Sequence, residues 1–213
     1  MTFIPDTAII LQFAIASVLL TLTPGPDMTL FIGRALSDGR AAGFACFIGA
    51  STGILVHTIL VALGLSALIV AAPAAFKALK IVGAGYLVWL AFQALRYGSA
   101  FKTEAGAKSE KTLFKHWATG IGINLLNPKI IIFFMTFLPQ FVTVSDPHAT
   151  GKLIFLGVLF IAIAVPLTIP MILAAESFSG TLKRNPKVTR VVDYLFAGVF
   201  SAFALKILTA HAK

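Results

Sequence analysis

The sequence is poor in charged residues and contains a single cysteine. Charged side chains make up 12% of the 213 residues, whereas a soluble domain has about 25%. Too few polar side chains remain to cover a surface that faces water, which excludes a soluble globular domain and a disordered chain. The lone Cys46 excludes a disulfide scaffold and leaves the redox compartment open.

Motifs for enzymatic chemistry are also missing. The chain has no P-loop, no cluster with metal-ligand spacing and no arrangement of a nucleophile with a base. These absences argue against an enzyme, an ATP-driven pump, a resident metal and any other cofactor. A membrane enzyme or an assembly protein is retained as the alternative from a different class.

Long apolar stretches are what the sequence has instead. Hydrophobic residues make up 58% of the chain, and the mean hydropathy is +0.94. A transmembrane helix needs about 20 mostly apolar residues, so the chain has room for six spans. The charge-free stretches predict an all-α integral membrane protein, with a single transmembrane domain over residues 1–213 and helices at about 8–33, 42–66, 76–96, 113–138, 151–175 and 190–208.

The net charge of +9 orients this bundle. Eleven Lys and Arg residues fall in the segments after the first, third and fifth spans, and five fall on the other side. Because cytoplasmic loops carry the excess of Lys and Arg, both termini are predicted to be periplasmic. Cations placed between membrane spans set orientation, so nucleic-acid binding is not expected.

The chain divides into two halves with matching interruptions. A basic segment, predicted to be a cytoplasmic loop, links half-repeats at about 1–98 and 111–213. Three spans per half means that the second half is inserted upside down. Pro24, Gly25 and Pro26 interrupt the first helix, while Asn124 to Pro128 interrupts the fourth. Matched breaks in corresponding spans are typical of a transporter's binding site, so the sequence predicts two inverted three-helix repeats with broken helices 1 and 4.

Each break is followed directly by a charged residue inside an apolar run. Asp27 follows Pro26, and Lys129 follows Pro128. A charge at the bilayer centre costs roughly 2.5–3.5 kcal/mol on insertion scales, so both side chains are expected to face the bundle interior and to need partners. A zwitterionic amino acid would offer its ammonium to Asp27 and its carboxylate to Lys129.

Two simpler interpretations of these charges stay open. Asp27 and Lys129 could only neutralise each other, or Asp27 could cap a cytoplasmic half-helix. Asn124 and Asn127, which flank the second break, could satisfy freed backbone groups or contact the substrate. The candidate site is Pro24, Gly25, Pro26, Asp27, Asn124, Asn127, Pro128 and Lys129.

Other polar features suggest secondary roles. His57, in the second predicted span, could relay protons or form a hydrogen bond between helices. Gln140 follows the fourth span and is a candidate gate or turn residue. Gly49 and Gly53 form a small-residue face for close helix packing. A metal-cation exporter would need several convergent ligands, and Asp27, His57 and Cys46 in the spans are too few to favour it.

Several of these segments together resemble the LysE/RhtB family of bacterial amino-acid exporters. The similarity covers nearly the whole chain, and it is carried by Thr23-Pro24-Gly25-Pro26-Asp27, residues 35–44, Lys80 to Leu87, residues 114–120, Asn127-Pro128-Lys129 and Leu138-Pro139-Gln140-Phe141. Their order and spacing make the match specific.

The resemblance implies secondary export of amino acids or their derivatives across the bacterial inner membrane, driven by an ion gradient, with H⁺ as the expected coupling ion. Family members are associated with efflux of lysine, arginine, threonine, homoserine, leucine or cysteine derivatives. It does not identify the substrate, and it leaves a homo-oligomer open. Export of another small metabolite or of a metal cation, as in the wider superfamily, is the alternative.

Overall fold

The computed structural model describes residues 3–97, 112–143 and 146–210, and this part of the chain is helical without strands. The elements are α1 (Thr7–Leu22), α2 (Pro26–Asp38), α3 (Arg40–Ala71), α4 (Pro73–Tyr97), α5 (Leu113–Leu125), α6 (Pro128–Ile132), the π-helix η1 (Phe133–Phe137), the 3₁₀ helix η2 (Leu138–Phe141), α7 (Ala149–Leu173), α8 (Ala175–Arg184) and α9 (Pro186–Ala210). All six predicted spans are helical, apart from the breaks within the first and the fourth. The basic linker predicted between the halves lies largely outside the described residues.

The two predicted breaks are confirmed. α1 and α2 meet at a bend of 50°, and α5 meets the segment from Pro128 to Phe141 at 54°. In both cases a proline is the first residue of the second helix. This position suits proline, because its missing N–H would have no partner in the first turn of a helix. The sequence pattern therefore located both interruptions correctly.

Length and composition identify up to four membrane spans among the described residues. The apolar run Arg40–Leu65 of α3 and helix α7 each qualify as a span, and each bent pair qualifies as one more. The apolar run of α4, Ala78–Gln93, is shorter. α4 and α9 have 25 residues each, about 37 Å of helix, which exceeds the roughly 30 Å of hydrocarbon in a bilayer. The architecture is that of an all-α membrane protein.

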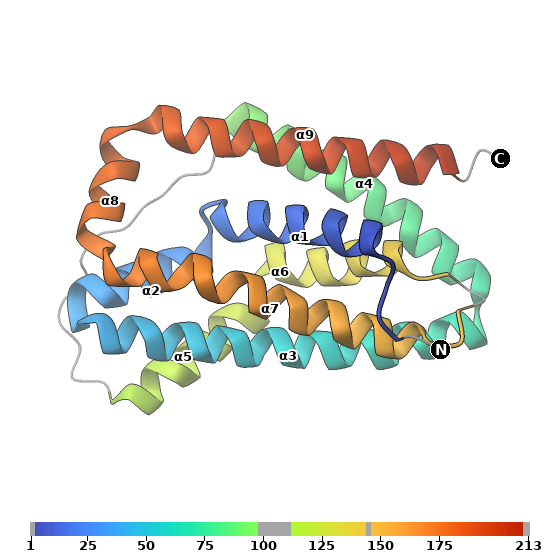
Figure 1. The fold of residues 1–213 in the computed structure, drawn as a ribbon, viewed down its shortest axis with the longest axis horizontal. Coiled ribbons are helices and arrows are strands. Elements are labelled where there is room, and N and C mark those ends of the chain that lie inside the picture. The colour runs from blue at the N-terminus through green and yellow to red at the C-terminus, as the bar shows by residue number, and fades with distance from the viewer. Residues whose placement is uncertain (1–2, 98–111, 144–145, 211–213) are drawn as a thin grey trace.

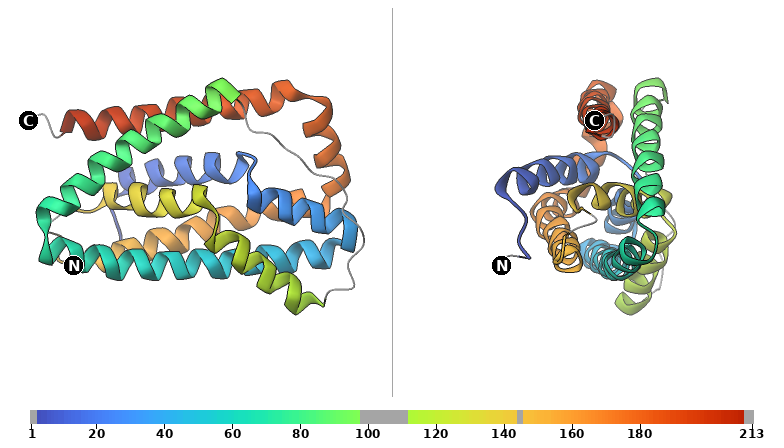
Figure 2. Two further views of the ribbon diagram at one scale, coloured as in Figure 1. Left: turned by 180° about the vertical axis from the view of Figure 1, so that it is seen from behind. Right: turned by 90° about the vertical axis from the view of Figure 1, so that its right-hand side faces the viewer.

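Corresponding helices of the two halves pack against each other. α4 packs against α9, and α3 packs against α7, as Figures 1 and 2 show. The first residues of α1 and the last of α9 lie at one end of the bundle, and α8 lies at the other end together with the α2–α3 connection. This arrangement places the described parts of both chain ends on the same side.

Two charged segments predicted as loops are helical instead. Arg34 lies within α2, and Arg40 begins α3, so that only Gly39 separates the two helices. Gly39 has φ of +91°, a backbone conformation that glycine adopts readily, and this one residue turns the chain. After the fifth span, Lys183 and Arg184 end the short helix α8 rather than a loop. Charge marks the membrane boundary here, but it does not stop a helix.

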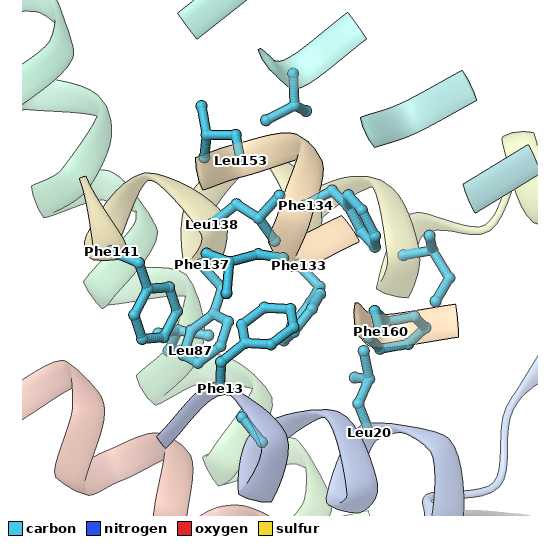
Figure 3. Packing of buried hydrophobic residues seen from close by; sticks show 14 of the residues in the cluster. Phe13, Leu20, Leu87, Phe133, Phe134, Phe137, Leu138, Phe141, Leu153 and Phe160 are labelled. Atoms are coloured by element: carbon cyan, nitrogen blue, oxygen red, sulfur yellow. The ribbon is translucent and has the colours of Figure 1, made fainter. Parts of the chain in front are cut away.

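An aromatic cluster fixes the second break in place. Phe133, Phe137 and Phe141 project from η1 and η2 toward Phe13 of α1 (Figure 3). The ring centroids of Phe133 and Phe137 are 4.8 Å apart, and those of Phe13 and Phe141 are 5.5 Å apart. All four rings are buried. Because α6 continues directly into η1, this packing holds Lys129 at a defined place in the bundle.

Candidate functional site

The two helix breaks meet in the interior, where each supplies partners for the other. Lys129, from the second break, donates from Nζ to the carbonyl oxygens of Leu20 at 2.9 Å and Thr23 at 2.7 Å. Asp27, from the first break, accepts through Oδ2 from Asn124 at 2.9 Å and Asn127 at 3.0 Å. These four side-chain hydrogen bonds join the first break to the second, and so join the two halves of the chain.

The position of Lys129 follows from the proline pattern. In an α-helix the N–H of residue i donates to the carbonyl of residue i−4. Pro24 has no N–H, so the Leu20 carbonyl loses its helical donor. An unsatisfied carbonyl is costly inside a membrane, and the Lys129 ammonium supplies the missing hydrogen bond. The carbonyl of Thr23, which follows the last residue of α1, receives a second one.

The second break is satisfied in a similar way. Pro128 removes the helical donor to the carbonyl of Asn124, which instead accepts from the backbone N–H of Asn127 at 3.1 Å. His57 Nε2, from α3, lies 3.5 Å from the same oxygen. His57 is therefore placed as a partner between helices, and its ring centroid lies 6.0 Å from that of Phe134. Its predicted role as a proton relay stays a prediction.

The Asn127 side chain both caps helix α6 and holds Asp27. Its side-chain oxygen accepts from the backbone N–H of Lys129 at 3.1 Å and caps the first turn of α6. Its amide nitrogen donates to Asp27. Asparagine suits this position because it carries an acceptor for the helix end and a donor for the carboxylate.

Small residues on α3 allow α5 to approach this closely. A Cβ added to Gly53 would stand 2.6 Å from Oδ1 of Asn124, and one added to Gly49 would stand 2.0 Å from the carbonyl oxygen of Trp117. Neither distance is tolerated by real side chains. The glycine pair predicted as a packing face thus brings Asn124 into reach of Asp27.

Asp27 and Lys129 do not pair directly. Within the described part of the chain, no ion pair joins them, although they interact electrostatically. Asp27 Oδ1 and Asn124 Oδ1 are buried and have no hydrogen-bond partner. Buried polar atoms without partners are uncommon and call for an explanation. Both are acceptors, so the site is short of N–H or O–H donors.

A cavity of about 60 Å³ lies at this meeting point, which is room for several water molecules at roughly 15 Å³ each. Of the predicted site residues, Gly25, Asp27, Asn124, Asn127 and Lys129 line it. The prolines, His57 and Gln140 do not. The remaining lining residues come mainly from α1, α2, α3 and α7, and are Leu20, Thr21, Thr23, Met28, Phe31, Ile32, Phe47, Ala50, Ile54, Ile130, Phe160, Ala164, Thr168 and Met171.

Gln140 has a separate place in the fold. Its amide nitrogen donates to the carbonyl of Thr136 at 2.8 Å and to that of Lys80, in α4, at 3.3 Å. It therefore ties η2 to α4. The role of Gln140 as a gate stays a prediction.

Sequence reasoning missed one charged neighbour and most of the cavity wall. Asp193, in α9, has 1% of its surface exposed and interacts electrostatically with Lys129. An acidic residue within the predicted span 190–208 was the signal that could have identified it. The apolar lining gave no such signal, because lipid-facing, core and cavity positions share the same residue types. Across the described residues, no group of three or more His, Cys, Asp or Glu could hold a metal ion.

Comparison with known proteins gives consistent matches over nearly the full length. Residues 18–211 match the family model described as LysE type translocator. The chain is 32% identical to a homoserine/homoserine lactone efflux protein of Salmonella typhimurium strain LT2, covering 93% of this chain and 95% of that protein. It is 30% identical to an uncharacterized membrane protein of Vibrio cholerae, covering 97% and 100%, respectively.

A leucine efflux protein of Enterobacter sp. strain 638 is 28% identical, covering 93% of this chain and 94% of that protein. No solved structure matches the chain significantly.

Proposed function

The chain belongs to the LysE-type translocator family, and on that premise we propose that it is a secondary exporter of amino acids or amino-acid derivatives rather than an enzyme. Relatives along nearly its whole length are named as efflux proteins for homoserine, homoserine lactone and leucine. Export is proposed to run across the bacterial inner membrane and to be coupled to the movement of H⁺.

One observation at the site carries this proposal. A carboxylate and an ammonium group face one cavity from opposite helix breaks without pairing, and two buried acceptors beside them lack donors. The ammonium of an amino acid would donate to Asp27 Oδ1 and Asn124 Oδ1. An ammonium side chain has three N–H donors, and the two carbonyl contacts of Lys129 leave the third for the substrate carboxylate.

The same contacts suggest how access could alternate. The network joins α1 and α2 of the first half to α5 and α6 of the second. A substrate that takes over the contacts of Asp27 and Lys129 would loosen the tie between the halves, which could then rock about the site. Asp27 is the proposed proton carrier, because protonation would remove the negative charge that holds the substrate ammonium.

The orientation follows from the placement of basic residues. The end of the bundle that holds α8 also holds Arg34, Arg40, Lys183 and Arg184. We infer that this end faces the cytoplasm, since cytoplasmic segments carry the excess of Lys and Arg. Both termini are then periplasmic.

Amino-acid pools measured without a chosen substrate test the function. Cells with and without the protein are compared for intracellular and extracellular amino acids, and the Asp27→Asn variant at matched membrane level serves as the inactive control. We expect at least one amino acid to shift from the intracellular to the extracellular pool only with the wild-type protein. Collapse of the proton gradient should abolish the shift. Unchanged pools of every amino acid would contradict the proposal.

A further inference from the structure

We propose that the substrate carries a neutral, largely apolar side chain, and that lysine, arginine, aspartate and glutamate are excluded by the cavity itself. This inference rests on the proposed function, and it narrows the substrate class of the same site. Two independent features support it, namely the number of charges in the cavity and the chemistry of the remaining wall.

The ammonium and carboxylate groups of an α-amino acid match both charged side chains of the cavity. Among the lining residues, all of which are described, Asp27 is the one acid and Lys129 is the one base. One ammonium and one carboxylate of an α-amino acid match them. A basic substrate would bring a second cation close to Lys129 with no second acid on the wall, and an acidic one would bring a second anion close to Asp27. A charge buried without a partner is strongly unfavourable.

The rest of the wall is apolar. Phe31 and Phe47 meet edge to face with ring centroids 5.5 Å apart, and both line the cavity together with Ile54, Phe160 and Met171. Ala50 and Ala164 line the same wall and add no polar group to it. An aliphatic side chain would bury its apolar surface against these groups, which favours its binding.

A single hydroxyl on α7 adds one polar contact. Thr168 lines the cavity with 4% of its surface exposed. Its hydroxyl forms no hydrogen bond with any described residue. It is therefore available to the hydroxyl of a small neutral side chain, and it offers no charge. The wall therefore matches short hydroxylated and branched aliphatic side chains in polarity, whereas it offers no charged partner to an ionised one.

Competition for transport into inside-out membrane vesicles tests the inference. The vesicles carry the full-length protein, and radiolabelled leucine and homoserine are the reporters. We expect unlabelled neutral aliphatic or hydroxylated amino acids to compete, while lysine and glutamate at equal concentration compete at least about tenfold less effectively. Equal competition by lysine and leucine would overturn the side-chain inference and leave amino-acid export intact. Uptake of no amino acid would overturn both.

An acidic residue added to the cavity wall tests whether the lack of a second acid is what excludes lysine. Thr168→Asp supplies the missing second acid, and Thr168→Asn is its control of nearly equal size without the charge. We expect the ratio of lysine to leucine transport to rise several-fold in Thr168→Asp and not in Thr168→Asn. An unchanged ratio in both variants, with the protein present in the membrane, would show that Thr168 is not beside the substrate side chain and would overturn the inference. If Thr168→Asp does not reach the membrane, the wild-type competition decides.

Discussion

Lys129 occupies the hydrogen-bonding position that Pro24 leaves empty. Its Nζ lies 2.9 Å from the Leu20 carbonyl oxygen, the acceptor for which proline has no N–H to offer. The backbone opened by one half of the protein is thus closed by a side chain from the other half. A change at either break should therefore disturb both, which would suit the alternating access proposed above.

Replacing the prolines of the first break should abolish export without preventing insertion. In a variant with Pro24→Ala and Pro26→Ala, a new N–H at position 24 can donate to the Leu20 carbonyl, so the helix can continue and Lys129 loses a partner. We expect normal membrane levels and lost efflux. Pro147→Ala, in the exposed turn before α7, is the matched control and should export normally. Wild-type export by the double variant would mean that the prolines serve packing alone.

Gly53 should be intolerant of even one methyl group. Its added Cβ would stand 2.6 Å from Asn124 Oδ1, so Gly53→Ala should push Asn124 away from Asp27 and cost about 1–3 kcal/mol through overpacking. Gly64→Ala, on the same helix, meets nothing within 4 Å and should be neutral or slightly stabilising. Thermal unfolding in detergent and transport at matched protein level compare the two. Equal behaviour of both variants would contradict the close approach.

The sequence predicted the breaks well because a proline has local consequences. Pro24, Pro26 and Pro128 each remove a backbone donor wherever the helix lies, so the interruptions follow from residue identity alone. The meeting of Asp27 with Asn124 and Asn127 is different. It depends on how α2 and α5 cross, and therefore on α3 glycines far away in the chain. The polar residues of the site could be nominated from the sequence, but their pairing could not.

The apolar lining of the cavity and the helix α8 could not be predicted from the sequence, for other reasons. Phe31 and Phe160 line the cavity, while Trp89 and Phe92 of α4 are exposed on the outside of the bundle. In a membrane protein both environments are apolar, so hydrophobicity does not separate them. The cations after the fifth span predict a loop, whereas Lys183 and Arg184 end the helix α8.

The carboxyl group of Asp146, just before α7, should make the free energy of unfolding depend on pH. Partial burial tends to raise the pKa of Asp146, but hydrogen bonds from Lys152 Nζ at 2.8 Å and from the His148 backbone N–H hold that pKa below its usual value. Such a group stabilises the fold above its unfolded pKa of about 3.9, and the contribution is lost as the pH falls through the folded pKa.

Lys152→Met should therefore lower the free energy of unfolding by about 0.2–1 kcal/mol at neutral pH. The difference from wild type should shrink below about pH 4, as followed by thermal unfolding in detergent. A difference that stays constant with pH would indicate that Lys152 acts by packing instead.

Reporter fusions test the predicted orientation. Fusions after residues 105 and 185 should report the cytoplasm, and a fusion at residue 213 should report the periplasm. The expectation follows from the clustering of Arg34, Arg40, Lys183 and Arg184 at one end of the bundle. A cytoplasmic signal at residue 213 would overturn the inverted six-span arrangement.

Variants of Asp27 and Lys129 distinguish two roles for these residues, binding of the substrate and neutralisation of each other's charge. Asp27 accepts from two asparagines, and Lys129 donates to two backbone carbonyls. Each charge is therefore held by its own partners, and Lys129 also interacts with Asp193. If Asp27 and Lys129 only neutralised each other, removing both charges would restore transport. If each binds one end of an amino acid, the double variant stays inactive.

We expect Asp27→Asn, Lys129→Met and the double variant each to export less than about one-tenth of the wild-type rate, since each loses a charge–charge contact with the substrate. Lys129→Met should also make an amino acid and its decarboxylated amine equally poor competitors, because recognition of the carboxylate is gone. Asp27→Asn, which keeps the size and acceptor of the side chain, should flatten the pH dependence of any residual efflux. Transport by all four proteins at matched membrane level and at two pH values measures these effects. Recovery of activity in the double variant would refute the binding roles of Asp27 and Lys129 while leaving the exporter function in place.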